Sequence, residues 1–467
     1  STDRVGVGTT APSSPLTVNQ SSGNINFELH SSSSGRGTQT KTHNDHATFF
    51  HGLAGDTSGD YIYYTADAKN HVFSTSNSEA MRIDSSGNVY IGGTSAATAD
   101  IALNASGSGT FGGAVKTSKV ENANTSNGGV EIDTAGHVKV DGLQMPTVGA
   151  LSNRNMIING AMQVAQRGTS NTSENGQNNY GIDRFQVACP LTTAVLAHTQ
   201  ESSGGPDGFT YWLKITPTTA DTTIGSTQYS TVNQKIEGYN FASARFGFAD
   251  ANAIAVSFKF KTNKAGTYCM IHRNLEANRN FLHEFTPVAN GNWQTISYTI
   301  PGDTAGNWES GSLIGFRWEL CLANGSSYQS STTGSWFAGQ YFHSSPNQVN
   351  FLDSTSNEIG ITAVQVELGE KATPFEHESY GQTFAKCQRY FETGSLKFYS
   401  GGLDLDTMAV IQTFKVTKRA SPTMVYSTAS SRAFLPTLTE YSDGESFCVQ
   451  KSNTREIACV FTATCEL

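Results

Sequence analysis

An internal repeat near the start of the chain constrains its fold more than any other sequence feature. Residues 82–93 and 131–142 share the pattern x-Ile-Asp-x-x-Gly-x-Val-x-[Ile/Val]-x-Gly. The Asp and the central Gly stand where a tight reversal needs a side-chain acceptor and a positive φ, and alternating residues flank them. Each unit is therefore predicted to be a short β-hairpin. Residues 4–9 resemble the returning strand of a third copy.

These hairpins carry too few apolar residues to stand alone. A two-stranded hairpin is marginal in water, and the only aromatic residue between positions 95 and 179 is Phe111. We therefore predict that three identical chains wind together, so that aliphatic side chains meet their symmetry mates on a three-fold axis. The candidate axis residues are Ile83, Val89, Ile91, Ile132, Val138 and Val140.

The later part of the chain alternates apolar and polar residues with a period of two. Three clear sets lie at residues 256–260, 296–300 and 314–322, and Trp318 in the third is predicted to be a core residue. Turns rich in Gly, Asn, Asp and Ser separate the sets, without long helical patterns between them. This arrangement favours a β-sandwich, and a span of about 200 residues suits a jelly roll.

One helix is predicted after the jelly roll. Ser379 and Gln382 have the spacing of a capping box. Apolar or aromatic residues then fall on one helical face, so a packed helix is expected from Ser379 to Glu392. The residues on this face are Tyr380, Phe384, Cys387 and Phe391.

The predicted fold is therefore all-β: a trimeric β-hairpin fibre shaft, a jelly-roll β-sandwich, one short helix and a small C-terminal β-domain. Small residues dominate positions 100–149, which predicts a slender shaft and leaves a flexible linker open for parts of it. The predicted divisions are a β-hairpin repeat domain at 1–95, a shaft or linker with the second repeat at 96–152, a connecting segment at 153–180, the jelly roll at 181–378, the helix at 379–393 and the C-terminal β-domain at 394–467.

Charge and hydropathy exclude several function classes. The formal net charge is -9 and no cluster of Lys and Arg exists, which argues against nucleic-acid binding. No run of about 18 apolar residues is present, so membrane insertion is not expected. Seven cysteines form no C-x-x-C pair and are expected to be mostly reduced and buried, as in a protein assembled in a reducing cytoplasm.

Signatures of enzymes and cofactors are missing. The sequence has no G-x-S-x-G elbow, H-E-x-x-H helix, phosphate-binding loop or dinucleotide fingerprint, so a non-enzymatic protein without a cofactor is expected. His43, His46 and His51 invite a metal interpretation. On a strand, however, His43 and His46 face opposite sides, so solvated polar positions are favoured.

Several segments resemble phage tail-fibre and tail-associated proteins. Residues 154–168 and 180–185 resemble the segments that introduce the distal binding domain of such proteins. Residues 361–369, 372–376 and 387–391 resemble the signature that closes it. The resemblance spans about residues 153–392.

This resemblance implies a homotrimeric fibre subunit of the virion tail, assembled in the host cytoplasm. Its N-terminal part would join other tail or virion proteins, and its carbohydrate-binding-like jelly roll would attach to a bacterial surface glycan or protein receptor. A glycan-depolymerising tailspike, a structural capsid or decoration fibre and a bacterial adhesin are the alternatives.

Loop aromatics with neighbouring polar groups are the expected glycan contacts, because sugars offer an apolar ring face and many hydroxyls. The candidates are Trp308, Trp336, Tyr328, Tyr341, Asn307, Glu309 and Gln340. The alternative, in which Trp336 and Phe337 cap the sandwich core, stays open.

Charged residues at the two ends of the jelly roll have two interpretations. Asp183 and Arg184 could clamp the first strand to a neighbour and Glu367 could anchor the last, since buried charges are usually paired. The alternative is a structural calcium ion with Asp183 and Glu367 as oxygen ligands. We favour the clamp.

Overall fold

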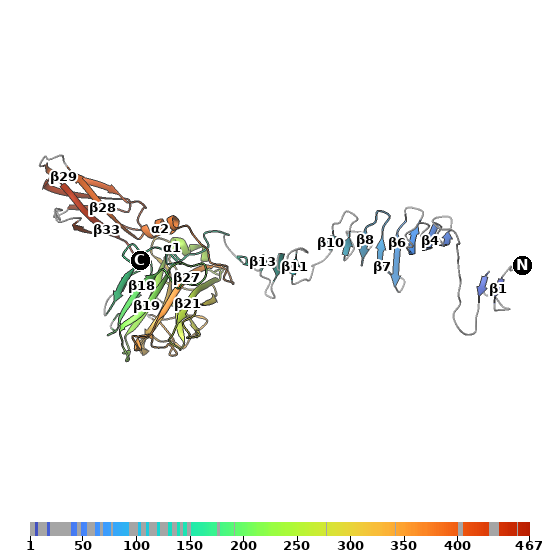
Figure 1. Cartoon of the computed structure of the whole chain (residues 1–467), viewed down its shortest axis with the longest axis horizontal. Coiled ribbons are helices and arrows are strands. Elements are labelled where there is room, and N and C mark those ends of the chain that lie inside the picture. The colour runs from blue at the N-terminus through green and yellow to red at the C-terminus, as the bar shows by residue number, and fades with distance from the viewer. Residues whose placement is uncertain are drawn as a thin grey trace. The chain divides into compact units, whose positions relative to one another are not determined.

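The computed structural model divides the chain into two compact units, residues 1–117 and 118–467, whose elements are labelled in Figure 1. Before residue 151 it describes residues 5–7, 16–18, 39–43, 48–53, 61–65, 69–75, 78–92, 101–103, 109–111, 119–121, 129–132, 138–140 and 143–146. From residue 151 onward it describes residues 151–174, 178–190, 192–276, 278–340, 342–399, 405–428, 439–454 and 456–467.

Short strands make up the described part of the first unit. A parallel pair is formed by β1 (Val5–Val7) and β2 (Leu16–Val18). An antiparallel sheet follows, with β3 (Gln39–His43), β4 (Thr48–Leu53) and β5 (Tyr61–Thr65). A five-stranded antiparallel sheet comes next, with β6 (His71–Thr75), β7 (Ser78–Ile83), β8 (Val89–Ile91), β9 (Ile101–Leu103) and β10 (Gly109–Phe111).

The first repeat forms the predicted hairpin. Strands β7 and β8 pair antiparallel, with Ile83 opposite Val89. At the reversal, the Asp84 carboxylate accepts hydrogen bonds from the main-chain N–H groups of Ser86 and Asn88, both at 2.9 Å, and Gly87 has φ +85°. Hydrogen bonds, first those from Asn88, lower the pKa of Asp84 to about 2. The Asp and Gly of the repeat thus have the roles that the pattern predicts.

The second repeat forms a hairpin of the same register. Ile132 lies opposite Val138, which is the spacing of Ile83 and Val89. In residues 4–9, β1 pairs in parallel with the strand after it, and their likeness to a returning strand stays a prediction because the described residues include no strand before β1. The sheet that holds the second repeat contains β11 (Lys119–Glu121), β12 (Gly129–Ile132), β13 (Val138–Val140) and β14 (Leu143–Gln144).

Two antiparallel sheets form the predicted jelly-roll β-sandwich, in which the chain passes repeatedly from one sheet to the other. The first sheet, in spatial order, contains β15 (Ser170–Ser173), β18 (Val195–Glu201), β19 (Trp212–Thr219), β27 (Ile359–Leu368), β21 (Ile254–Thr262) and β24 (Gln294–Ile300). The second contains β16 (Asn178–Tyr180), β17 (Gln186–Ala188), β20 (Tyr229–Glu237), β25 (Ile314–Asn324), β22 (Tyr268–Arg273), β23 (Arg279–Phe285) and β26 (Trp336–Ala338).

The sandwich core follows the predicted alternation. The three predicted sets are strands β21, β24 and β25, and their apolar residues point between the sheets because side chains alternate along a strand. Trp318 is fully buried, and its ring meets those of Phe185 and Phe258 edge to face at centroid distances of 6.0 and 5.8 Å. Its prediction as a core residue is confirmed.

The predicted helix is present but shorter than expected. Helix α2 (Tyr380–Gln388) begins with the predicted capping box between Ser379 and Gln382. It ends before Glu392 because strand β28 begins at Phe391. Cys387 is buried as expected, whereas Tyr380, expected on the packed face, is 56% exposed.

The C-terminal β-domain consists of two three-stranded antiparallel sheets around a small apolar core. One sheet contains β28 (Phe391–Tyr399), β33 (Glu456–Thr464) and β30 (Thr423–Thr428). The other contains β29 (Leu405–Thr413), β32 (Ser446–Thr454) and β31 (Thr439–Ser442). Among the described residues, no helix is long and apolar enough to cross a membrane.

Candidate functional site

Residues 154–168, which precede the sandwich strands, are hydrogen-bonded to strand β27. The Asn155 amide donates to the carbonyl of Val364 at 3.0 Å and accepts from the N–H of Val366 at 3.1 Å. A Cβ atom at Gly160 would lie 2.1 Å from the Val364 carbonyl oxygen, so only glycine permits this approach. The segments that carry the tail-fibre resemblance therefore meet in space, and the contacts between them are structural.

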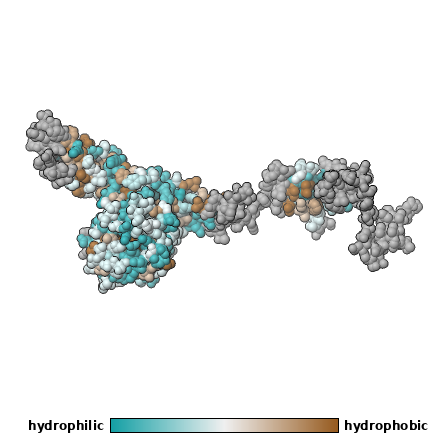
Figure 2. Space-filling model, in the orientation of Figure 1, coloured by the Kyte–Doolittle hydropathy of each residue, from teal (hydrophilic) through white to brown (hydrophobic). Residues whose placement is uncertain are grey.

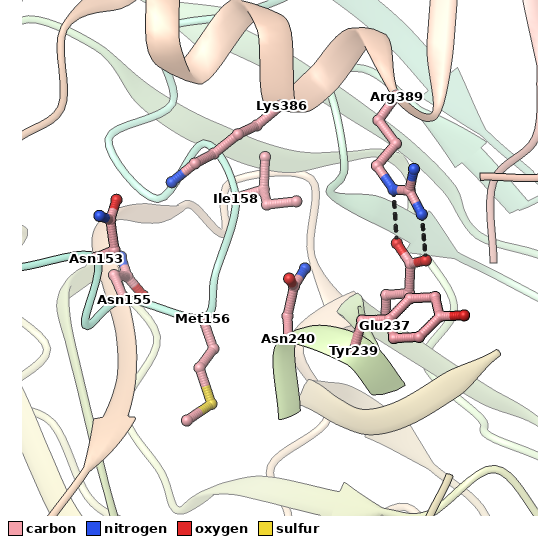
Figure 3. A pocket seen from close by; sticks show the side chains of 9 residues that line it. All are labelled: Asn153, Asn155, Met156, Ile158, Glu237, Tyr239, Asn240, Lys386 and Arg389. Atoms are coloured by element: carbon pink, nitrogen blue, oxygen red, sulfur yellow. Dashed lines mark hydrogen bonds and ion pairs between the residues drawn. The ribbon is translucent and has the colours of Figure 1, made fainter. Parts of the chain in front are cut away.

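A cavity of about 450 Å³ lies beside this junction. It is bounded by the segment that precedes the sandwich strands, by the end of β20 with helix α1 (Gly238–Phe241), and by helix α2 (Figure 3). Its volume falls within the range of ligand sites, about 300–1,000 Å³. The lining residues are Asn153, Asn155, Met156, Ile158, Glu237, Tyr239, Asn240, Lys386 and Arg389.

The one carboxylate that lines this cavity is fully engaged. Glu237 accepts hydrogen bonds from Arg389 Nε at 2.9 Å and from its terminal nitrogen at 2.6 Å, the pair drawn with dashed lines in Figure 3. The Tyr390 hydroxyl donates to the same carboxylate at 2.6 Å. Both Glu237 oxygens therefore accept hydrogen bonds from the protein, and the Arg389 guanidinium neutralises their charge.

The rest of the lining suits a neutral, hydroxyl-rich ligand. Asn153 and Asn240 are exposed, and an amide can both donate and accept hydrogen bonds. The side chain of Tyr239 is 65% exposed, while Met156 and Ile158 supply a largely buried apolar surface. Lys386 extends from α2 over the cavity, as Figure 3 shows, and forms an ion pair with Glu378. Sequence reasoning missed this cavity because Met156 and Ile158 lie in a segment noted only for its resemblance, and Lys386 is not one of the residues on the apolar face of the predicted helix. Asn153, Tyr239 and Asn240 lie outside the segments that were singled out.

The two predicted tryptophans pack against the sandwich core. Trp308 and Trp336 meet edge to face at 5.2 Å, and both contact Phe246. Their indole N–H groups donate to main-chain carbonyls, of Ala305 at 3.0 Å and of Pro301 at 2.7 Å. Both rings are partly buried, so neither presents a full open face, and their role in glycan binding stays a prediction.

The other predicted glycan residues do not form one site with the cavity. Tyr328 packs against Tyr229 and His343, at centroid distances of 5.8 and 5.7 Å. Gln340 and Asn307 are exposed, and Glu309 accepts from the N–H of Gly311. Tyr341 lies outside the described residues. His46, one of the three histidines considered above for a metal, also lies outside them.

Asp183 and Glu367 each bind protein donors. Both Asp183 oxygens accept from Gln166, at 2.9 Å from its N–H and 2.5 Å from its amide. The Glu367 oxygens accept from the N–H and hydroxyl of Thr373, both at 2.7 Å, and from Arg154 at 3.3 Å.

These contacts leave no ready set of calcium ligands. Within the described ranges, no group of three His, Cys, Asp or Glu side chains could hold a metal ion. Arg184, between β16 and β17, forms an ion pair with Glu466 in the last described segment, 456–467. A structural calcium stays a prediction without geometric support.

Several of the predicted axis residues are exposed in the single chain. Val138 and Val140 share one face of β13, and Val140 lies opposite Val130 and Leu143. The four side chains are between 38% and 60% exposed. Ile91 in the first unit is also exposed, whereas Ile83 and Val89 are half-buried, and the side chain of Ile132 lies outside the described residues.

Comparisons with known proteins give only distant likenesses. No protein-family model and no curated protein match this chain. The enzymatically active domain of tailspike protein 4 from bacteriophage CBA120 is 11% identical, with a TM-score of 0.24 over 46% of this chain and 21% of that one. The family 11 carbohydrate-binding module from Clostridium thermocellum, in complex with a β-1,3-1,4-mixed-linked tetrasaccharide, is also 11% identical, with a TM-score of 0.22 over 44% of this chain and 98% of that one.

A third likeness is to the N-terminal endo-1,4-β-D-xylanase 10B of Clostridium thermocellum, complexed with xylohexaose. It is 13% identical, with a TM-score of 0.21 over 38% of this chain and 25% of that one. This chain thus spans about a fifth of the tailspike domain's length. Likenesses this weak define no function, so the proposals below rest on the chain's own residues.

Proposed function

We propose that this chain is a non-enzymatic subunit of a phage tail fibre that attaches to a glycan on the bacterial surface. The observation that carries the binding role is the cavity beside α1 and α2. It combines exposed amides at Asn153 and Asn240, the exposed ring of Tyr239 and an apolar surface. The tail-fibre assignment is supported by the resemblance of residues 154–168 and 361–391 to the segments that bound the distal domain of such proteins.

Binding is favoured over hydrolysis at this cavity. Glycosidases use two carboxylates on opposite sides of the scissile bond. The cavity has one, Glu237, and Arg389 and Tyr390 occupy it. A glycan-depolymerising tailspike is the second candidate. New reducing ends released from host capsule or lipopolysaccharide by the purified protein would favour it over a binder.

The cavity can be tested by competition for adsorption. Soluble protein should block adsorption of the phage that carries it, and Tyr239→Ala combined with Asn240→Ala should weaken the block about tenfold or more, because it removes one ring contact and one amide. Tyr380→Ala is the matched control, since Tyr380 is similarly exposed but does not line the cavity. Equal competition by the cavity variant would exclude this cavity as the receptor site. Failure of the wild-type protein to compete would remove receptor binding altogether.

A homotrimer is supported by apolar faces that one chain leaves uncovered. Figure 2 shows a hydrophobic patch on the described part of the first unit, whereas the visible face of the sandwich is mostly hydrophilic. Phe73, which is 55% exposed, lies opposite Met81, and Met81 lies opposite Ile91. A sheet with an exposed apolar face needs a cover, and identical chains supply one by symmetry. Three linked copies of a weak site would also gain affinity by avidity.

The trimer has a direct test in solution. Light scattering should give three times the mass of one chain. Val138→Asp with Val140→Asp should lower that mass, because it places charges on the proposed contact face. Val288→Asp is the control, since Val288 is exposed on the sandwich. A monodisperse single-chain mass for the wild-type protein at micromolar concentration would rule out the trimer.

A further inference from the structure

Three cations stand side by side on the outer face of the second sandwich sheet. Lys235 on β20 lies opposite Arg317 on β25, which lies opposite Arg273 on β22. Their chain neighbours Ile236 and Phe316 point into the core, so this row points away from it. Like charges directly opposite each other on neighbouring strands destabilise a sheet. Such a row therefore needs counter-charges.

The protein supplies direct partners for two of the three cations: a carboxylate for Arg273 and a main-chain oxygen for Lys235. Arg273 pairs with Glu319 at 2.6 Å, and both side chains are 3% exposed. The second oxygen of Glu319 lies 2.6 Å from His343 Nδ1, which donates to it. Lys235 donates to the main-chain oxygen of Leu467 at 2.5 Å. Both Glu319 oxygens therefore have a direct partner, and neither of these partners is Arg317.

Arg317 is the cation of this row that has no direct partner in the described part of the chain. Its Nε is enclosed and has no hydrogen-bond partner among the described residues, and the same holds for Nε of the buried Arg273. Burial, and then the neighbouring Arg273, lower the pKa of Arg317. Glu319, which Arg273 and His343 already occupy, attracts Arg317 without a direct contact, and the phenol groups of Tyr229 and Tyr180, both partly exposed, are its other neighbours. A ligand that reaches Arg317 would therefore meet a guanidinium with unused donors and two phenol groups.

We propose that this face binds an anionic group, a carboxylate or phosphate, at Arg317. A guanidinium offers donors in a planar fork that matches either group. The ligand would supply the direct ion pair that Arg317 lacks, and partial enclosure would strengthen the interaction relative to open water. The sheet thereby carries a second site, separate from the cavity beside α2, that selects acidic over neutral glycans.

Calorimetry with the full chain tests this site. Glucuronate should bind, while glucose at equal ionic strength should not, and inorganic phosphate in a separate titration shows whether phosphate is preferred to carboxylate. Arg317→Gln should weaken binding of the preferred anion about tenfold or more, and Arg317→Lys should retain part of it. Arg245→Gln is the control, because Arg245 is exposed and pairs with Asp250. Unchanged affinity in Arg317→Gln, or no binding of either anion to the wild type, would overturn the proposal.

Thermal unfolding without ligand separates binding from support of the fold. Because Arg317 repels its two neighbours, Arg317→Gln should leave the melting temperature unchanged or raise it. A lower melting temperature in both Arg317→Gln and Arg317→Lys would contradict this, since it would make the guanidinium a structural group. The cavity variants leave Arg317 intact. A negative result for anion binding at Arg317 therefore does not affect the adsorption test of the cavity, and a negative adsorption result does not affect the anion site.

Discussion

The β-sandwich is expected to lose stability as the pH falls from about 6.5 to about 4, because it encloses histidines in their neutral form. Burial lowers the pKa of His198 to about 4 and that of His272 to about 3. Both side chains are fully buried in the sandwich. Protonating either ring would place a charge where water cannot reach it.

The hydrogen bonds around His198 explain why the charged form is disfavoured. Its Nε2 lies 3.1 Å from the Ser173 hydroxyl, and that hydroxyl donates to the carbonyl of Val187. Nε2 must therefore donate to Ser173, which leaves Nδ1 as a bare acceptor without a partner. Burial outweighs the main-chain hydrogen bond of Thr172, which favours the charged ring, so the pKa of His198 stays lowered.

The sign of the effect follows from the lowered pKa. The unfolded chain binds the proton near pH 6.5 and the folded chain only near pH 4, so the contribution is fully present above pH 6.5 and is lost as the pH falls towards 4. For His198 this gap of about two and a half pH units corresponds to about 3 kcal/mol. His272 adds to the loss in the same direction.

Tryptophan fluorescence isolates this loss, because all five tryptophans lie in the sandwich. The free energy of unfolding in urea should fall between pH 7 and pH 4.5 in the wild type and fall less in His198→Leu. Asp183, whose pKa burial raises, titrates alike in both proteins and cancels in the comparison. His377→Leu, at an exposed position, should follow the wild type. Parallel curves for His198→Leu and the wild type would refute the assignment.

Features set by local sequence were predictable, and features set by strand pairing were not. The hairpin at Asp84 and the alternation around Trp318 follow from turn chemistry and side-chain direction, which a short window contains. The predicted helix extended too far because the sequence around Cys387 does not show that a strand begins at Phe391. Loop position likewise did not reveal that Trp308 would turn back onto the core.

The candidate sites required knowledge of which segments meet. The cavity joins Asn153, Tyr239 and Lys386, which are far apart along the chain. The cation row exists only because β25 pairs with both β20 and β22, so that Arg317 stands between two other cations. No local pattern encodes that register, since each strand by itself shows only an ordinary polar residue at an outward position.

Replacing Glu319, the carboxylate that pairs with Arg273 of the cation row, should cause the largest loss of stability among the single substitutions considered. Glu319→Gln is expected to destabilise the sandwich by about 3–5 kcal/mol, because it leaves Arg273 buried without a counter-charge. Burial alone would raise the pKa of Glu319, but Arg273 and then His343 hold it well below its ordinary value, so the carboxylate is charged at neutral pH. The measurement is urea unfolding at pH 7, again followed by tryptophan fluorescence.

The free energies of unfolding of two variants must be compared: one that removes only the Glu319 charge and one that removes both Glu319 and Arg273. Glu284→Gln, on strand β23 of the same sheet and more exposed, should change the free energy of unfolding by no more than about 0.5 kcal/mol. Arg273→Met with Glu319→Leu should be less destabilised than Glu319→Gln alone, because removing the pair also removes the stranded charge. If the free energy of unfolding of Glu319→Gln lies within about 1 kcal/mol of the wild-type value, Arg273 must be hydrated or paired with another group. The electrostatic account of the row, and with it the isolation of Arg317, would then fail.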